Sequence, residues 1–337
     1  MNGVSHIKKQ AWHDFLTSLI DAYQIYAPIQ KFNTLDYQHL TVEDIPNITY
    51  NLPKPITPLK IFFLPVKENV GAELSNSKPS IIIGCPACDL HALDILDEIY
   101  LKEPFTDPFY QQKRAQTILI GTDCHATQEH CHCTTYGIDP IPDKHADLLL
   151  SVMEDNVILE IKSQKGEALI NNLSTTNAPS NKLINKLTTL RETVIHQLHE
   201  DHQQLPNYEK TRELIKSSDD FIWEKYSNTC VSCGACATIC PTCTCFLLVD
   251  RPGFEKVRQI DACQLPGFAR IAAGEDPLGS LSTRFKNRYL CKYVWKPEKF
   301  KSIACTGCGR CIETCIGNIN KNELFMELND EIKGRTL

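Results

Sequence analysis

Long apolar runs are missing from this sequence of 337 residues. No window approaches the ~18 consecutive apolar residues that a membrane helix needs, so we expect no membrane span. The amino-terminal stretch MNGVSHIKKQAWHDFL is polar and has helical spacing, which does not fit a secretory signal peptide. We therefore expect the chain to be cytoplasmic, in a compartment where thiols stay reduced.

Several motifs of nucleotide and peptide chemistry are absent as well. No G-x-G-x-x-G follows a predicted strand, and neither G-x-x-x-x-G-K-[ST] nor H-E-x-x-H occurs. The CCG motif of heterodisulfide-reductase-type cysteine sites is also missing. A sequence pI near 6.0 argues against nucleic acid as a partner. The sequence thus indicates no substrate site of its own, and we assign no catalytic residue.

Cysteine, in contrast, is abundant, with 17 residues. In a reducing compartment such a density indicates metal binding rather than disulfides. Five cysteines lie at 85–133, six at 230–245 and four at 305–315, whereas Cys263 and Cys291 stand alone. The groups therefore predict separate binding sites.

Two of the groups have the spacing of bacterial ferredoxins, C-x2-C-x2-C-x3-C, and Pro241 completes the motif in the first of them. Three closely spaced thiolates can bind three corners of a 4Fe–4S cube, and in two-cluster ferredoxins the fourth cysteine of each run ligates the other cube. The predicted ligands are Cys230, Cys233, Cys236 and Cys315 for one cluster, and Cys305, Cys308, Cys311 and Cys240 for the other.

Structural zinc and radical chemistry are the competing interpretations of these runs. Zinc sites usually show two separated C-x2-C pairs, whereas three cysteines in series occur twice here. Cys236, Cys240 and Cys243 also have the C-x3-C-x2-C spacing of radical S-adenosylmethionine enzymes, but no large βα repeat follows. We therefore favour two clusters. Cys243 and Cys245 are not needed as ligands. We interpret them as buried packing residues rather than as groups that contact the clusters.

The amino-terminal cysteines follow two predicted strands. The segment GCPACDLHAL comes after PSIIIG, and GTDCHATQEHCHC comes after AQTILIG, so their thiols are placed to converge. Four ligands are available as Cys88, Cys124, Cys131 and Cys133, with Cys85 as a spare. Because His125, His130 and His132 crowd the same loop, a mixed Cys/His zinc site stays open.

The remaining patterns predict an α+β protein. Residues 6–26, 88–101 and 180–226 have helical spacing, the last interrupted at 202–209. Strands are expected at 59–65, 79–84 and 115–121, and a hairpin at 146–163 with its turn at 154–156. Beyond residue 227, Pro, Gly and Cys are expected to prevent long elements.

These elements divide the chain into three predicted parts. An amino-terminal α/β domain (1–165) precedes a helical connecting segment (166–226) and a ferredoxin-like domain for two 4Fe–4S clusters (227–337). The last part contains a basic insertion at 251–304, with 11 Lys and Arg against 5 Asp and Glu. Its cations can favour a reduced, anionic cluster, form a solvated face, or contact a partner protein.

Seven motifs in order, between about residues 50 and 320, carry a resemblance to a known family. They are TPLKIFFLP, CDLHALDILDEIYL, DPFYQQKRAQTILIG, CHC, CVSCGACATICPTCTCF, DACQLPGF and CTGCGRCIETC. Together they resemble the iron–sulfur beta subunit of cytosolic nickel–iron hydrogenases (sulfhydrogenases) and the related electron-transfer subunit of anaerobic sulfite reductase. DPFYQQKR favours the hydrogenase branch.

The resemblance implies a third iron–sulfur cluster, held by Cys88, Cys124, Cys131 and Cys133. Two positions depart from the family pattern. The family has Arg-Pro ahead of the cysteine that precedes Asp, whereas GCPACD here makes Cys85 a competing ligand. Ile316 follows Cys315 where the family has Pro.

The resemblance also implies the function of an electron-transfer subunit. It would relay electrons between two other proteins, a reductase subunit that binds flavin and NAD(P)H, and a catalytic nickel–iron hydrogenase subunit. The alternatives are an electron-transfer subunit of a sirohaem sulfite reductase and an iron–sulfur oxidoreductase that acts alone. A zinc-bound assembly or regulatory protein is a further possibility.

Overall fold

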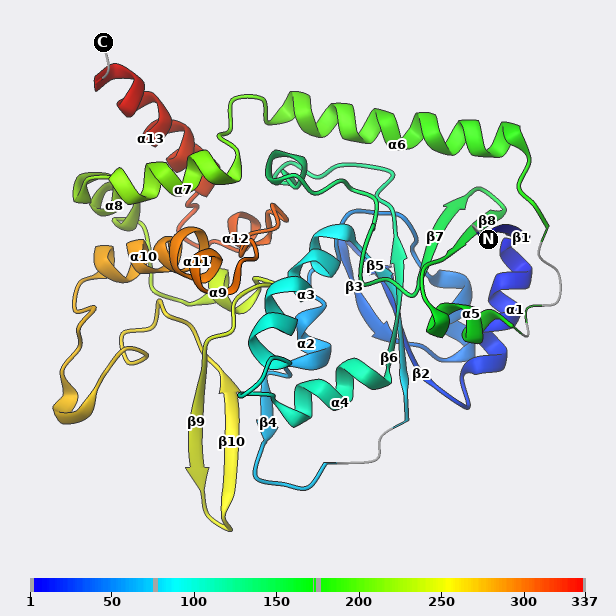
Figure 1. Cartoon of the computed structure of the whole chain (residues 1–337), viewed down its shortest axis with the longest axis horizontal. Coiled ribbons are helices and arrows are strands. Elements are labelled where there is room, and N and C mark those ends of the chain that lie inside the picture. Colours follow the sequence, from blue (N-terminus) through cyan, green and yellow to red (C-terminus); the bar gives the residue numbers. More distant parts are fainter. Residues whose placement is uncertain (1–2, 75–77, 172, 174–176, 336–337) are drawn as a thin grey trace.

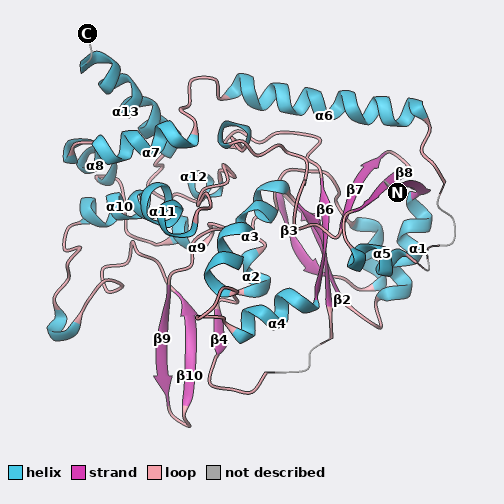
Figure 2. Ribbon diagram, in the orientation of Figure 1, coloured by secondary structure: helices cyan, strands magenta, loops and turns pink. Residues whose placement is uncertain are grey.

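The computed structural model describes residues 3–74, 78–171, 173 and 177–335. Its amino-terminal part is built on a seven-stranded sheet in the order β1-β8-β7-β6-β5-β2-β3 (Figures 1 and 2). The four central strands are parallel, and antiparallel strands complete both edges. The strands are β1 (Val4–Lys8), β2 (Gln24–Lys31), β3 (Thr34–His39), β5 (Ser80–Cys85), β6 (Thr117–Thr122), β7 (Leu148–Met153) and β8 (Asn156–Ile161).

Helices cover both faces of this sheet because its central strands are apolar on both sides. Ile81 and Ile83 of β5 belong to one core, whereas Ile82 between them belongs to another. The first core contains residues of α1 (Lys9–Leu19) and α5 (Gln164–Ile170). The second contains residues of α2 (Lys60–Phe63), α3 (Ala87–Tyr100) and α4 (Pro108–Gln116).

Three further helices connect the sheet to the cysteine-rich part. The long helix α6 (Asn181–Asp201) lies along one side of the molecule, and α7 (Tyr208–Ser217) and α8 (Asp220–Ser227) follow it (Figure 1). Ser180 caps α6 by accepting a hydrogen bond from the Leu183 amide, and Asn207 caps α7 in the same way. The sequence therefore determines where each helix begins.

Helices of 4 to 15 residues and a projecting hairpin make up the cysteine-rich part (Figure 2). Strand β10 pairs on one side with β9 and on the other with β4, which comes from the amino-terminal part. An aromatic core that includes Trp223, Tyr289 and Phe325 packs beside the cysteine runs. The elements are β4 (Lys67–Asn69), α9 (Ala235–Thr238), β9 (Phe246–Arg251), β10 (Glu255–Ile260), α10 (Leu281–Leu290), a π-helical turn (Cys291–Trp295), α11 (Lys296–Phe300), α12 (Arg310–Glu313) and α13 (Lys321–Arg335); 3-10 turns occupy Val42–Asn47, Thr134–Tyr136 and Ala272–Gly274.

Several predicted elements are confirmed. Strands β5 and β6, helix α3 and the β7–β8 hairpin lie where the apolar patterns place them. The helical pattern of 180–226 is also confirmed, with its break between α6 and α7. The mixed α/β class is thus observed. No helix among the described residues is long and apolar enough to cross a membrane.

Three predictions are wrong. The segment 59–65 contains helix α2 at 60–63 rather than a strand, because Leu59 and Phe63, four residues apart, are both fully buried in one core. The helix expected at 6–26 is shortened by β1 and β2, whose backbones pair with β8 and β5. Long helices do form beyond residue 227, since α10 and α13 bury aromatic side chains in a shared core.

Candidate iron–sulfur sites

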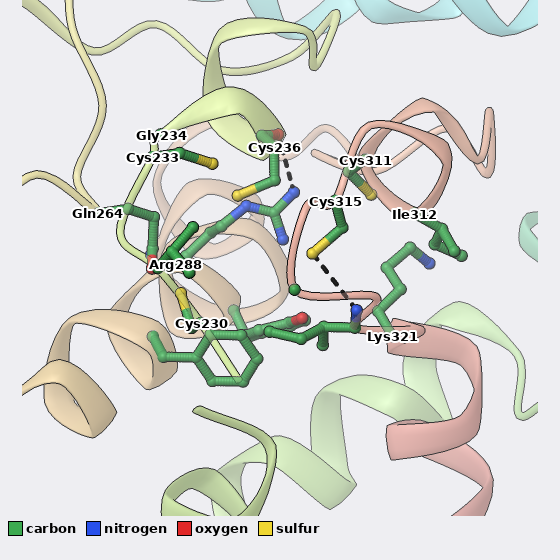
Figure 3. Close-up of a pocket in the computed structure, with 15 residues that line it drawn as sticks. Cys230, Cys233, Gly234, Cys236, Gln264, Arg288, Cys311, Ile312, Cys315 and Lys321 are labelled. Atoms are coloured by element: carbon green, nitrogen blue, oxygen red, sulfur yellow. Dashed lines mark hydrogen bonds between the residues drawn. The ribbon is translucent and has the colours of Figure 1, made fainter. Parts of the chain in front are cut away.

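The four thiols predicted for the first cluster, site A (Cys230, Cys233, Cys236 and Cys315), line one cavity of about 40 Å³. Figure 3 shows them gathered there from the loop around α9 and from the segment after α12, with Arg288 between them. Gly234 has a φ of +73°, and a Cβ at this position would lie 2.7 Å from the Ala262 Cβ. The backbone therefore turns tightly because residue 234 lacks a side chain.

Arg288 supplies positive charge to site A. Its Nη2 donates to the Cys236 carbonyl oxygen over 3.1 Å, and its side chain is buried. Burial opposes its charge, but Cys236 and Cys311 outweigh that effect and raise the pKa of the guanidinium. Among the described residues, the buried Arg288 Nε has no hydrogen-bond partner. A cationic donor aimed into a ring of thiols fits an anionic cluster.

The second set, site B (Cys240, Cys305, Cys308 and Cys311), surrounds the start of α12. Three of these thiols are buried, and Cys308 lies within electrostatic range of Cys240 and Cys311. Lys292, which is only 4% exposed, donates from Nζ to Cys240 Sγ over 2.9 Å and to the Ala304 carbonyl oxygen over 3.0 Å. A hydrogen bond from Cys243, together with Lys292, lowers the pKa of the Cys240 thiol. These contacts therefore favour the thiolate form of Cys240.

The third set, site C (Cys88, Cys124, Cys131 and Cys133), lines a cavity of about 20 Å³. Cys88 lies in the first turn of α3 and Cys124 follows β6, so the carboxyl ends of two parallel strands bring them together. Lys54 donates from Nζ to Cys131 Sγ over 3.4 Å and pairs with Glu313 over 2.7 Å. Burial raises the pKa of the Cys88 and Cys124 thiols, so thiolates there require a metal or another cation.

The competing ligands near site C lie elsewhere. Cys85 is buried in the core beside β5, where its thiol donates to the Ile82 carbonyl oxygen over 3.5 Å, and it does not line the cavity. His132 is buried with its Nε2 2.8 Å from Lys321 Nζ. His125 and His130 are also outside the cavity lining. The polar groups that line this cavity besides its thiols are Lys54 and Thr127.

Backbone contacts join sites B and C. The His132 amide donates to the Gly307 carbonyl oxygen over 2.9 Å. A Cβ at Gly307 would lie 2.5 Å from the His132 carbonyl oxygen, and one at Gly309 would lie 2.4 Å from that of His130. Both glycines have positive φ, of +67° and +77°. The two loops therefore lie directly against each other.

A buried ion pair strengthens the same junction. Arg310, between Cys308 and Cys311, donates to both carboxylate oxygens of Asp89 over 2.6 and 2.8 Å. Asp89 is the residue after Cys88, and both charged side chains are almost completely buried. The bidentate pair gives both buried charges hydrogen-bond partners. An unpaired charge at this position would be strongly destabilising.

The three sites form a row. Cys311 of site B also lines the cavity of site A, and Cys308 of site B lines the cavity of site C. At sites A and C the thiols surround a cavity, and among the described residues no three His, Cys, Asp or Glu side chains lie close enough to share a single ion. Ligands that bind different iron atoms of one cluster fit this arrangement.

Sequence reasoning missed the individual cations of these sites. The excess of Lys and Arg at 251–304 pointed to Arg288 and Lys292 only as a group. Lys54 and Arg310 had no such signal, since each is an isolated charge in its segment. Their positions beside the thiols depend on how the loops around sites B and C pack together.

Comparison with known proteins adds two findings. Residues 229–319 match the 4Fe-4S dicluster domain family, which supports two 4Fe–4S clusters in this segment. The chain is also similar to the protein named Sulfhydrogenase 2 subunit beta of Pyrococcus furiosus, with 26% identity over 333 residues, which cover 94% of this chain and 96% of that protein. The predicted resemblance to sulfhydrogenase beta subunits is confirmed, and the sulfite reductase alternative is not favoured.

Proposed function

We propose that this chain is an electron-transfer iron–sulfur subunit that relays electrons between two partners, a reductase that binds flavin and NAD(P)H, and a catalytic nickel–iron hydrogenase. The observation that carries the proposal is the row of three thiol sites, in which site B shares a lining cysteine with each neighbour. Similarity to a protein named as a hydrogenase subunit supports partners of this kind.

The ligand sets of sites A, B and C are part of this proposal, and so is the third cluster at site C. Bound 4Fe–4S clusters supply one-electron exchange. The side chains of the chain hold and tune them. Arg288, Lys292 and Lys54, one for each site, place positive charge beside the thiols, which stabilises the more negative, reduced state.

The row of sites has two ends near the surface. Cys233 of site A is exposed. At the other end, site C shares Pro53, Lys54, Ala126 and Thr127 with a surface cleft of about 620 Å³. Site B, whose thiols are mostly buried, lies between them. Electrons can therefore enter at one end and leave at the other, as a relay requires.

The first test is the metal content of protein purified without oxygen. We expect about twelve iron and about twelve sulfide per chain, with four of each for every cube. About eight would restrict the relay to sites A and B. Zinc without iron or sulfide would overturn the proposal.

A second test concerns electron flow and ligand exchange between the runs. In the co-purified complex, a hydrogenase partner and a flavin partner should both be present, and the clusters should be reduced by hydrogen or by NAD(P)H. In the Cys240→Ser variant, paramagnetic resonance should change for the cluster held by Cys305, Cys308 and Cys311, whereas local ligation would change the other signal. Clusters that neither donor reduces would contradict the proposed role.

A further inference from the structure

Two of the cysteines outside sites A–C meet at the base of the projecting hairpin. The β9–β10 ladder ends with Phe246 opposite Ile260, and the Asp261 amide then donates to the Cys245 carbonyl oxygen over 3.0 Å. Cys263 follows two residues later, and its thiol lies close enough to that of Cys245 for each to shift the pKa of the other. Antiparallel pairing therefore brings together thiols that are 18 positions apart in the sequence.

The surroundings of this pair favour thiol chemistry. Cys245 lines a cavity of about 20 Å³ together with Lys60 and Arg258. The hydrogen bond from Cys263, with further help from Lys296, lowers the pKa of Cys245 to about 6. The same contact raises the pKa of Cys263, which keeps its proton. One thiolate beside one thiol is the arrangement from which a disulfide forms and reopens.

The pair is also close to site B. Cys243 lies within electrostatic range of Cys263, and its thiol donates a hydrogen bond to Cys240. Lys292 acts on both Cys240 and Cys243. The pair therefore lies near Cys243 and, beyond it, the predicted cluster ligand Cys240.

We propose that Cys245 and Cys263 form a redox-active dithiol–disulfide couple that exchanges electrons with the clusters of this chain. This inference rests on the proposed relay. Oxidation forms the S–S bond, releases the one proton that the Cys263 thiol carries, and would pass one electron to each of two oxidised 4Fe–4S clusters. Reduction reverses each change. The couple would store two electrons beside 4Fe–4S clusters that exchange one electron at a time. Such a store suits a relay between two-electron donors such as hydride and hydrogen.

The experiment is a reductive titration of the anaerobically purified chain that starts from its fully oxidised form. We expect wild-type protein to take up two electrons more than the Cys263→Ser and Cys245→Ser variants. Cys291→Ser is the matched control and should equal wild type. Cys291 is a cysteine of the same segment, but it lines neither the cavities of sites A and C nor the cavity beside Cys245.

Mass spectrometry after acid quenching and alkylation gives an independent readout. The oxidised wild-type chain should contain a peptide pair linked between Cys245 and Cys263, and the reduced chain should contain both cysteines alkylated. Equal electron uptake in all variants, with full iron content, would overturn the couple and leave the relay intact. Loss of iron in Cys245→Ser or Cys263→Ser would also overturn it, since these cysteines would then be ligands. A wild-type chain without iron would instead refute the relay.

Discussion

Strand β5 buries five consecutive residues, Ile81–Cys85, whereas the cysteine runs at 230–245 and 305–315 contain only the four-residue helices α9 and α12. Around β5, aliphatic side chains from several helices fill two cores. Around the runs, cavities lined by thiols occupy the corresponding interior space. The amino-terminal part thus has a fold stabilised by apolar burial, and we expect the loops of the cysteine-rich part to depend in addition on the groups proposed to bind their thiols.

Removal of iron should have the largest effect, because it should destabilise the cysteine runs and leave the sheet intact. We expect a chelator with a mild oxidant to increase amide exchange strongly at 230–245 and 305–315, because the only helices in these loops are the four-residue α9 and α12. Exchange in β5 and β6 should stay slow. Hydrogen-exchange mass spectrometry measures both regions in one sample. Unchanged exchange at the cysteine runs would show that the aromatic core beside them is sufficient.

Site C tests whether the sheet part also depends on metal. The Cys88→Ala variant should lose about four of about twelve iron atoms, since Cys88 lines the cavity of site C. Cys85→Ala is the matched control and should keep the wild-type iron content, because Cys85 packs in the core instead. Iron loss in the Cys85 variant with retention in the Cys88 variant would reverse the ligand assignment.

A cavity in the sheet core should reduce stability without changing metal content. Leu93 of α3 is fully buried in the core that faces β5. Its replacement by Ala should lower the free energy of unfolding of the sheet part by about 2–5 kcal/mol. Denaturation followed by amide exchange in β5 measures the loss, and iron per folded chain should not change. A large loss of iron would mean that the two parts unfold as one.

The smallest effect is expected for a charge beside a cluster. Lys292→Met removes the cation that contacts Cys240, so the reduced state of the site B cluster should become less stable and its potential should fall. A contribution of about 1.4 kcal/mol corresponds to about 59 mV for one electron. Lys292→Arg, which keeps the charge, is the control in a potentiometric titration followed by paramagnetic resonance. Equal potentials in both variants would assign Lys292 a packing role.

The sequence was most informative where local patterns and structure depend on the same few residues. The cysteine spacing predicted which thiols line a common cavity at site A, because the spacing reflects the geometry of ligation, whereas the set at site C followed from the family resemblance. The apolar runs of β5 and β6 also predicted their strands. In α2, however, the short pattern of apolar residues was compatible with either a strand or a helix, and only burial in the tertiary core decided it.

Long-range contacts were out of reach of the sequence. The pairing of β4 with β10 joins segments nearly 200 residues apart, and no local sequence pattern predicts this pairing. The ion pair of Arg310 with Asp89 likewise depends on how two distant loops pack. The contact of Cys245 with Cys263 required the register of the β9–β10 ladder. Such contacts are decided by the whole fold rather than by neighbouring residues.

The close approach of residues 307 and 309 to the loop 130–133 has a consequence for how related sequences can diverge. A Cβ at either glycine would displace the backbone of His130 or His132, and positive φ adds strain for any other residue. We therefore expect natural substitutions to be rare at these two positions even where the surrounding loop residues vary freely. A lineage that lost either glycine would need a compensating change in the opposite loop, so the two segments should evolve together.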